Sequence, residues 1–280
     1  MDEIWTEIIL YLPIKDLLNL NITCADFHKI VREYKITDDK YAHNIILKSL
    51  GQLINYNFRS YYINYPYIDN YSDNYNLLDK ISKLNIVKLP DNLNIGSLIN
   101  LQALKISLGM HTSDLDKITD ESIIKLTNLT SLDINNCENV TDNSIMHLPN
   151  LISLNIGSCH NITDKAISSN LRQLTVYGHF YPYQIDNFKK FIYLEELSLY
   201  FSAIIDTSLS HLINLKFLKL NSCFNIEMIK DLNNLTTLIL IDCNNIKTIK
   251  RLSNLRMLKI KMCQKIKTIS NLNSLTNLNI

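Results

Sequence analysis

The residues with the strongest capacity for chemistry in this sequence are its cysteines, because a thiolate can bind a metal ion, form a disulfide or act as a nucleophile. Five of the six recur eight residues after the first leucine of a repeated segment: Cys137, Cys159, Cys223, Cys243 and Cys263. Successive turns of a parallel repeat lie ~4.8 Å apart with parallel side chains, so such thiols do not converge on one zinc ion at ~2.3 Å. We therefore expect a buried column of small side chains, with no metal, no other cofactor and no disulfide.

Other catalytic arrangements are also missing from the sequence. The seven histidines are scattered, and there is no glycine-rich phosphate loop, HExxH motif or GxSxG motif. Glycine accounts for only five of the 280 residues. We therefore do not expect an enzyme.

The cysteine spacing belongs to a repeat that is most regular at 20 residues, over 215–280. One such unit cannot bury its own apolar side chains, so a fixed period of this length predicts a solenoid of stacked repeats. The pattern LxxLxLxxC resembles the cysteine-containing class of leucine-rich repeat. Three leucine or isoleucine columns define it: Leu215, Leu235, Leu255 and Leu275; Leu218, Leu238, Leu258 and Leu278; Leu220, Leu240, Ile260 and Ile280.

The repeats begin near Ile81, and their spacing varies from 20 to 28 residues before Leu215. Each LxxLxL segment predicts a short strand with alternate residues pointing inward. Ile-Thr-Asp or Val-Thr-Asp at 118–120, 140–142 and 162–164, and a looser Ile-Asp-Thr at 205–207, predict capped helical turns on the opposite side. The last three repeats lack this cap, so an extended segment or a 3₁₀ turn is expected there. The fold class is α/β, a curved leucine-rich-repeat solenoid with a parallel concave sheet.

Residues 1–31 predict two short helices. Ile4, Ile8 and Leu12 recur at helical spacing, Pro13 ends the first helix, and Asp16 caps the second. From Asp2 to Phe27 the segment resembles an F-box, which docks substrate receptors on the Skp-type adaptor of a cullin-RING ubiquitin ligase. The resemblance implies adaptor contact through Ile8, Leu12, Pro13, Leu17, Leu20, Cys24 and Phe27.

Two features depart from the F-box pattern. The opening Leu-Pro pair is absent, and Phe27 stands where the family usually has Trp. A helical cap over the first repeat is the alternative, because solenoids need capped ends. The expected domains are an F-box-like helical domain at 1–50, a connector rich in tyrosine and asparagine at 51–80, and the solenoid at 81–280.

The residues that flank the inward leucines of each strand should line the concave face. Along the chain this face changes from small and polar to aromatic and apolar with lysine. Exposed apolar patches of this kind usually mark protein-binding sites. We expect Tyr177, Tyr200, Phe217, Ile239, Ile241 and Met257 to form a contiguous stripe across five turns. The predicted target-binding residues are these six together with Asp133, Asn155, Lys219 and Lys259.

Charge does not name a partner for the whole chain, which carries 28 basic and 27 acidic side chains. Residues 215–280 alone carry 11 basic and 3 acidic side chains, a net charge of +8. A basic end can attract nucleic acid, although lysine also keeps a solenoid edge soluble. We expect no nucleic-acid partner.

Nothing in the sequence predicts a membrane-spanning segment or a signal peptide, so we expect a cytoplasmic or nuclear protein, in a host cell if it is viral. The composition, rich in Ile, Asn, Lys and Tyr, is similar to that of F-box repeat proteins of giant amoeba viruses. The sequence ends at Ile280 inside a predicted strand, so either the chain is cut there or that strand edge is open.

Two functional hypotheses follow. The first is the substrate-recognition subunit of an SCF-type ubiquitin ligase, which docks a Skp-type adaptor and the cullin core and holds an unknown target protein on the concave face. Such a subunit would act by bringing the target close to the charged conjugating enzyme, because tethering raises the effective concentration of the target there. The second is a scaffold or inhibitor built of leucine-rich repeats, with a helical N-terminal cap and no ligase.

Overall fold

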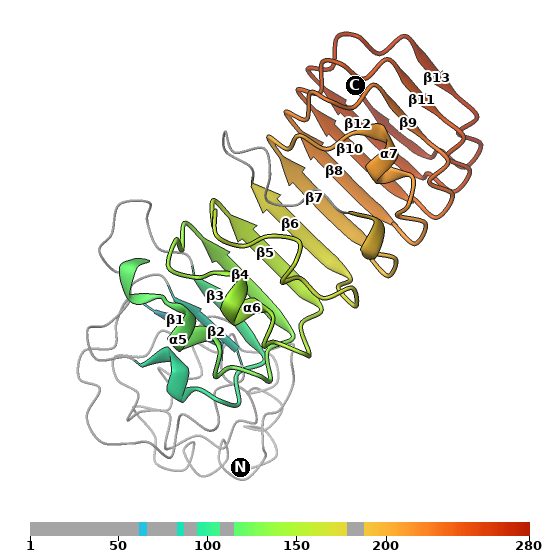
Figure 1. Ribbon diagram of the computed structural model, residues 1–280. Coiled ribbons are helices and arrows are strands. Elements are labelled where there is room, and N and C mark those ends of the chain that lie inside the picture. Colours follow the sequence, from blue (N-terminus) through green and yellow to red (C-terminus); the bar gives the residue numbers. More distant parts are fainter. Residues whose placement is uncertain (1–61, 66–82, 87–93, 107–114, 178–187) are drawn as a thin grey trace, which may run out of the picture. The chain divides into compact units, whose positions relative to one another are not determined.

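A computed structural model describes residues 62–65, 83–86, 94–106, 115–177 and 188–280 (Figure 1). The expected F-box-like helices at 1–50 lie outside these residues. The chain divides into two compact units. The described parts of the first are 62–65, 83–86, 94–106 and 125–129, and those of the second are 115–124, 130–177 and 188–280.

The described part of the first unit contains three parallel strands: β1 (Tyr62–Tyr65), β2 (Lys83–Ile86) and β3 (Ala103–Ile106). Leu84 of β2 is in register with Leu104 of β3, and both side chains are buried. A 3₁₀ turn, η3 (Ile95–Ser97), lies between β2 and β3 in the chain. β1 pairs with β2, although it falls within the expected connector at 51–80. The first strand therefore lies upstream of Ile81, where we expected the repeats to begin.

The second unit is built around a parallel sheet whose strands follow one another in chain order (Figure 1). Each strand centres on the Leu-x-Leu, Leu-x-Ile or Leu-x-Val core of a repeat, as predicted. In all but the last strand the inward residues are buried, and apart from Gly157 the outward residues are half-buried or exposed. Leu278 in the last strand is 53% exposed. The strands are β4 (Ser131–Asn135), β5 (Ser153–Gly157), β6 (Gln173–Tyr177), β7 (Glu196–Tyr200), β8 (Phe217–Asn221), β10 (Thr237–Ile241), β12 (Met257–Lys261) and β14 (Asn277–Asn279).

The opposite side of the second unit changes along the chain. Short helices α5 (Asp120–Ile123), α6 (Asp142–Ile145) and α7 (Asp206–Leu209) begin at three of the four predicted cap positions. Of these three helices only α6 has a side-chain cap, in which Thr141 accepts from the Asn143 amide. At the fourth cap position, Ile162-Thr163-Asp164, residues Asp164–Ala166 form only a turn. Two 3₁₀ turns, η4 (Leu115–Lys117) and η5 (Phe188–Lys190), complete the helical elements of the described residues.

The last three repeats use extended segments in place of helices, which was one of the two expected conformations. Strands β9 (Met228–Lys230), β11 (Thr248–Lys250) and β13 (Thr268–Ser270) form a second, three-stranded parallel sheet (Figure 1). Ile229 and Ile249 of this second sheet are buried in the core between it and the larger parallel sheet. A short extended segment needs fewer residues than a helix, which explains the 20-residue period.

The chain turns sharply after each long strand. The residue that follows β4, β5, β7, β8, β10 and β12 has a positive φ, although none of the six is glycine: Asn136, Ser158, Phe201, Ser222, Asp242 and Met262. This left-handed conformation strains residues that carry a Cβ atom. The repeat geometry therefore imposes a small energetic cost at these turns.

Candidate protein-binding surface

The outward residues of β4, β5, β6, β7, β8, β10 and β12 form one continuous surface, which we call the sheet face. In-register pairing of the strands arranges the sheet face in three columns, named after the first, third and fifth residue of each strand. The third-residue column holds Asp133, Asn155, Thr175, Ser198, Lys219, Ile239 and Lys259.

The strand register corrects the predicted stripe of six apolar residues. Tyr177 and Tyr200 adjoin one another in the fifth-residue column, but Asn221 separates them from Ile241. Phe217 and Met257 lie in the first-residue column, where Thr237 separates them. The stripe was predicted by combining different repeat positions. The structure brings the six residues to one face but divides them into a tyrosine pair and a separate apolar group on β8, β10 and β12.

The tyrosine pair is the one stacked aromatic contact on the described sheet face. The rings of Tyr177 and Tyr200 stack with centroids 4.1 Å apart and planes inclined by 11°. The Lys219 ammonium lies 4.9 Å from the centre of the Tyr200 ring, a cation–π contact. Burial, followed by the hydrogen bond with Tyr200 and the charge of Asp133, raises the pKa of Tyr177 to about 12. Tyr177 is therefore a neutral phenol at physiological pH and offers a flat aromatic surface.

The sheet face is polar beside Tyr177. The side-chain amides of Asn155 and Asn135 donate to the same Asp133 oxygen, at 2.9 and 3.3 Å. Gly157 lies between Asn135 and Tyr177 in the fifth-residue column. A Cβ atom on Gly157 would lie 1.9 Å from Asn135 Oδ1, so only glycine permits this close packing. Gly157 therefore allows the polar cluster to lie close to the tyrosine pair.

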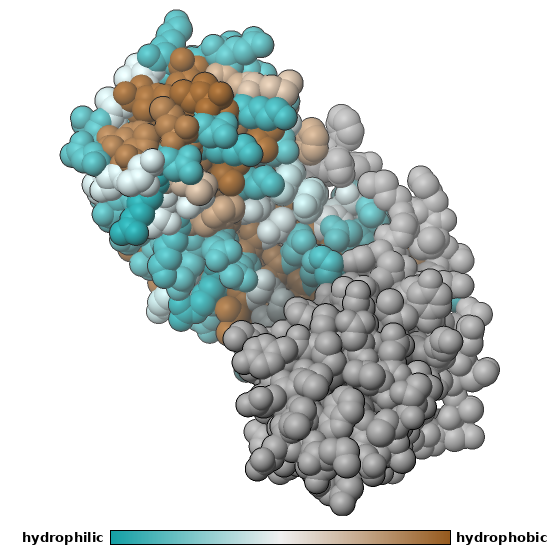
Figure 2. All heavy atoms as spheres, turned by 180° about the vertical axis from the view of Figure 1, so that it is seen from behind, coloured by the Kyte–Doolittle hydropathy of each residue, from teal (hydrophilic) through white to brown (hydrophobic). Residues whose placement is uncertain are grey.

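The far half of the sheet face combines apolar and basic side chains. Phe217, Ile239 and Ile241 are half-exposed and Met257 is 40% exposed. Lys219, Lys259 and Lys261 lie among them. Figure 2 shows apolar surface gathered, among hydrophilic side chains, at the end of the second unit that carries the last repeats. The exposed large apolar residues of the final repeats include Met262, Ile269, Leu278 and Ile280.

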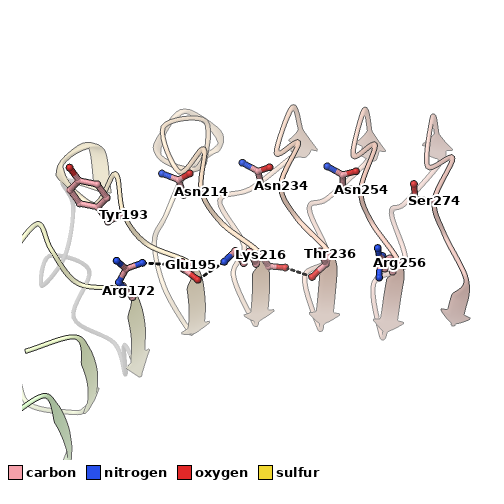
Figure 3. Close-up of a pocket in the computed structure, with 10 residues that line it drawn as sticks. All are labelled: Arg172, Tyr193, Glu195, Asn214, Lys216, Asn234, Thr236, Asn254, Arg256 and Ser274. Atoms are coloured by element: carbon pink, nitrogen blue, oxygen red, sulfur yellow. Dashed lines mark hydrogen bonds and ion pairs between the residues drawn. The ribbon is translucent and has the colours of Figure 1, made fainter.

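A second feature runs along the edge where the strands begin, a polar hollow of about 520 Å³ that we call the edge groove (Figure 3). Glu195 lies between Arg172 and Lys216, with N–O distances of 2.5 and 2.6 Å. Lys216 and then Arg172 hold the pKa of Glu195 below its usual range. Asn214, Asn234 and Asn254 form the other wall (Figure 3), and each donates to a main-chain oxygen of the preceding turn at 2.7–2.8 Å.

The sequence analysis missed the edge groove. Its signal is present in the column that directly follows the first leucine of each repeat, where Arg172, Glu195 and Lys216 alternate in charge. Because these side chains are exposed, their ion pairs contribute little to stability. The groove therefore connects neighbouring repeats and offers no catalytic arrangement.

The cysteines form the expected buried column. Cys137, Cys159, Cys223 and Cys243 are buried, and Cys263 is partly exposed. The Cys243 thiol donates to the Ile241 carbonyl at 3.3 Å, and the Cys243 amide donates to Cys263 Sγ at 3.3 Å. The interaction in which the Cys243 thiol donates to Cys223, together with burial, raises the pKa of Cys243 to about 11, so Cys243 is not a thiolate nucleophile at neutral pH.

Other sequence-based expectations can be placed as follows. Among the described residues there is no group of three or more His, Cys, Asp or Glu side chains that could hold a metal ion. Within the same part of the chain, no helix is long and apolar enough to cross a membrane. The predicted adaptor-binding residues lie outside the described ranges: Ile8, Leu12, Pro13, Leu17, Leu20, Cys24 and Phe27.

No protein-family model and no curated protein matches the chain. Solved structures do. The structure of a TLR13–ssRNA13 complex is similar at 20% identity with a TM-score of 0.51, over 79% of this chain. This chain spans only 35% of that one.

Two further structures resemble the chain less closely. The functional domain of InlJ from Listeria monocytogenes, which includes a cysteine ladder, shares 14% identity over 85% of this chain and 56% of its own, with a TM-score of 0.46. The leucine-rich-repeat domain of the type III effector XopL shares 19% identity over 73% and 70%, with a TM-score of 0.39. The repeat geometry and the TLR13 likeness show a leucine-rich-repeat fold.

Proposed function

We propose that this chain is a non-enzymatic receptor that captures a target protein on the sheet face of its leucine-rich repeats. The observation that carries this proposal is the stacked Tyr177–Tyr200 pair with Lys219 beside it, next to the half-exposed apolar group on β8 and β10. Aromatic side chains held rigidly at a surface give large contact area with little loss of conformational entropy, which is typical of binding hot spots.

The position of the tyrosine pair also suits binding of a partner, because the pair is not needed to cover the core. Its two rings stack on the outward side of the sheet, so the inward leucines do not depend on them for burial. The polar cluster of Asp133, Asn135 and Asn155 on one side and the lysines on the other supply the hydrogen-bonding rim that protein interfaces require.

We propose further that residues 1–50 join this receptor to a Skp-type adaptor, so that the bound target is presented to a cullin-RING ubiquitin ligase. The F-box-like residues between Asp2 and Phe27 support this step. A scaffold or inhibitor that binds the same target without the adaptor is the alternative.

The target-binding part of the proposal is tested with a partner found by crosslinking to the full-length chain in cells and then purified. The variant Tyr177→Ser plus Tyr200→Ser should weaken its binding by about tenfold or more, because truncated hot spots cost ~2 kcal/mol. Ile213→Ser, which replaces an exposed residue outside the sheet face, is the matched control and should bind like the wild type. Equal binding by both variants and the wild type would exclude the sheet face as the binding site.

The adaptor step is tested separately with purified Skp-type adaptor and the full-length chain. Binding should be lost in Leu17→Asp plus Leu20→Asp while target binding persists. If the folded wild type fails to bind the adaptor but still binds its target, the chain is the scaffold or inhibitor and not a ligase subunit.

A further inference from the structure

We infer that the far half of the sheet face, on β8, β10 and β12, holds an acidic amphipathic α-helix of the target that lies across the strands. This inference rests on the proposed function and names the chemical class of its partner.

Charge is the first argument. The outward residues of β8, β10, β12 and β14 include Lys219, Lys259 and Lys261 but no carboxylate. Acidic side chains border this region at Glu196, which pairs with Phe217 of β8, and at Asp242 directly after β10. Asp242 already accepts hydrogen bonds from Ser222 and Asn244, at 3.1 and 2.7 Å. A partner with carboxylates is therefore favoured by charge complementarity, which steers association and fixes register.

The apolar residues of this surface favour a partner that also carries apolar side chains. Ile239 lies between Lys219 and Lys259 in the third-residue column, because β10 pairs in register with both neighbours. Phe217 and Met257 lie one column to the side, on the same two strands as these lysines. The complementary partner therefore carries an apolar side chain midway between two acidic ones.

The distance between Lys219 and Lys259 indicates the secondary structure of the partner. Neighbouring strands are ~4.8 Å apart, so the α-carbons of Lys219 and Lys259 are separated by about 9.6 Å, with Ile239 halfway. Seven residues of α-helix advance ~10.5 Å and return to nearly the same face. Same-face residues of an extended strand recur at about 6.6 or 13.2 Å. The helix matches the lysine spacing, with acidic residues at i and i+7 and apolar ones at i+3 and i+4.

The backbone of the sheet supports the same choice. The main-chain groups of β10 are paired with β8 and β12, so they cannot bond a peptide laid across the face. An extended peptide there would leave its own amide groups without partners, which is costly when they are buried. An α-helix satisfies its backbone internally and can present side chains alone.

The test is selection of random 16-residue peptides on the full-length chain, followed by fluorescence anisotropy with the consensus peptide. The selected peptides should show Asp or Glu at a spacing of seven residues with apolar residues between. Lys259→Glu and Ile239→Asp should each weaken binding of the consensus peptide by about five- to tenfold. Lys230→Glu on β9, in the second sheet, is the charge-matched control and should leave binding unchanged.

Several outcomes would overturn the inference. These are the absence of any selected peptide, a consensus that is basic or lacks the seven-residue spacing, and binding insensitive to Lys259→Glu. Binding of a 20-nucleotide single-stranded RNA that is lost in Lys259→Glu, without peptide binding, would assign the lysines to nucleic acid instead. Failure here differs from failure of the proposed function, because a target that still depends on Tyr177 and Tyr200 would leave that function intact.

Discussion

The connection between Asp120 and Thr141 allows a sharp test of how neighbouring repeats are joined. The Thr141 amide donates to Asp120 Oδ1 at 2.8 Å, and the Thr141 hydroxyl donates to Asp120 Oδ2 at 2.6 Å. The next repeat uses the same arrangement, in which Thr163 donates to Asp142. Thr141→Val removes the hydroxyl without changing the shape of the side chain. It leaves one Asp120 oxygen without this donor and also removes the acceptor of the Asn143 amide at the start of α6.

The expected cost can be worked out from this geometry. A hydrogen bond to a charged group contributes ~1.5–3 kcal/mol when buried. Asp120 and Thr141 are only half-buried, so solvent screening reduces the value. We expect Thr141→Val to lower the free energy of unfolding by about 1–2 kcal/mol at pH 7.

The pH dependence gives an independent check. Partial burial raises the pKa of Asp120, but hydrogen bonds from Ser144 and Thr141 lower it by more, so the net pKa lies below the ordinary value of 3.8. A carboxyl group whose pKa is lowered by folding stabilises the protein above its unfolded pKa, and this contribution is lost as the pH falls through the folded pKa. The difference between Thr141→Val and the wild type should therefore be full at pH 7 and shrink below about pH 4.

Urea unfolding followed by circular dichroism measures this difference. Thr175→Val is the matched control, because Thr175 is half-buried on the sheet face and should change stability by less than ~0.5 kcal/mol. If Thr141→Val is as stable as Thr175→Val at pH 7, the hydroxyl does not join the repeats. A deficit that is the same at pH 3 and pH 7 would show that the loss does not come from the Asp120 charge.

Two further substitutions test local packing and backbone strain. Gly157→Ala should destabilise the protein by about 1–2 kcal/mol, because its Cβ would lie 1.9 Å from Asn135 Oδ1, and adding Asn135→Ala should recover most of the loss in urea unfolding. Met262→Gly should raise the midpoint of thermal unfolding and add about 0.5–1 kcal/mol, since Met262 is exposed with a φ of 55°, whereas the same change at Met257 within β12 should lower it. A loss of stability in Met262→Gly would show that this turn is not strained.

The strands of the second unit were predictable because buried leucine columns repeat at nearly constant spacing. Leu218, Leu238 and Leu258 mark three strands that the structure places in register. β1 was not predictable in this way, since Tyr62–Tyr65 contains no leucine. The turn after Thr163 shows the limit of capping signals. Thr163 accepts from the Lys165 amide at 3.3 Å as a cap would, yet no helix follows it.

The sheet face was predictable only in part. Alternation within each LxxLxL segment correctly identified which residues point outward, because a strand has a period of two. Which of those residues adjoin one another depends on whether they occupy the first-, third- or fifth-residue column. The predicted stripe did not take these columns into account. The edge groove was overlooked because its ion pairs join residues 21 to 23 positions apart, a relation that becomes visible only when the repeats are aligned.

The outward positions of the strands differ from repeat to repeat, whereas the inward positions do not. Inward positions must repeat, because each buried leucine packs on its equivalents in the adjacent turns. Outward positions carry no such constraint, since surface substitutions usually change stability by less than ~0.5 kcal/mol. Stacking alone therefore does not require the third-residue column to pass from Asp133 through Thr175 and Lys219 to Lys259. This change from acidic to basic character fits the proposed function, in which the sheet face recognises a partner with the opposite arrangement of charge.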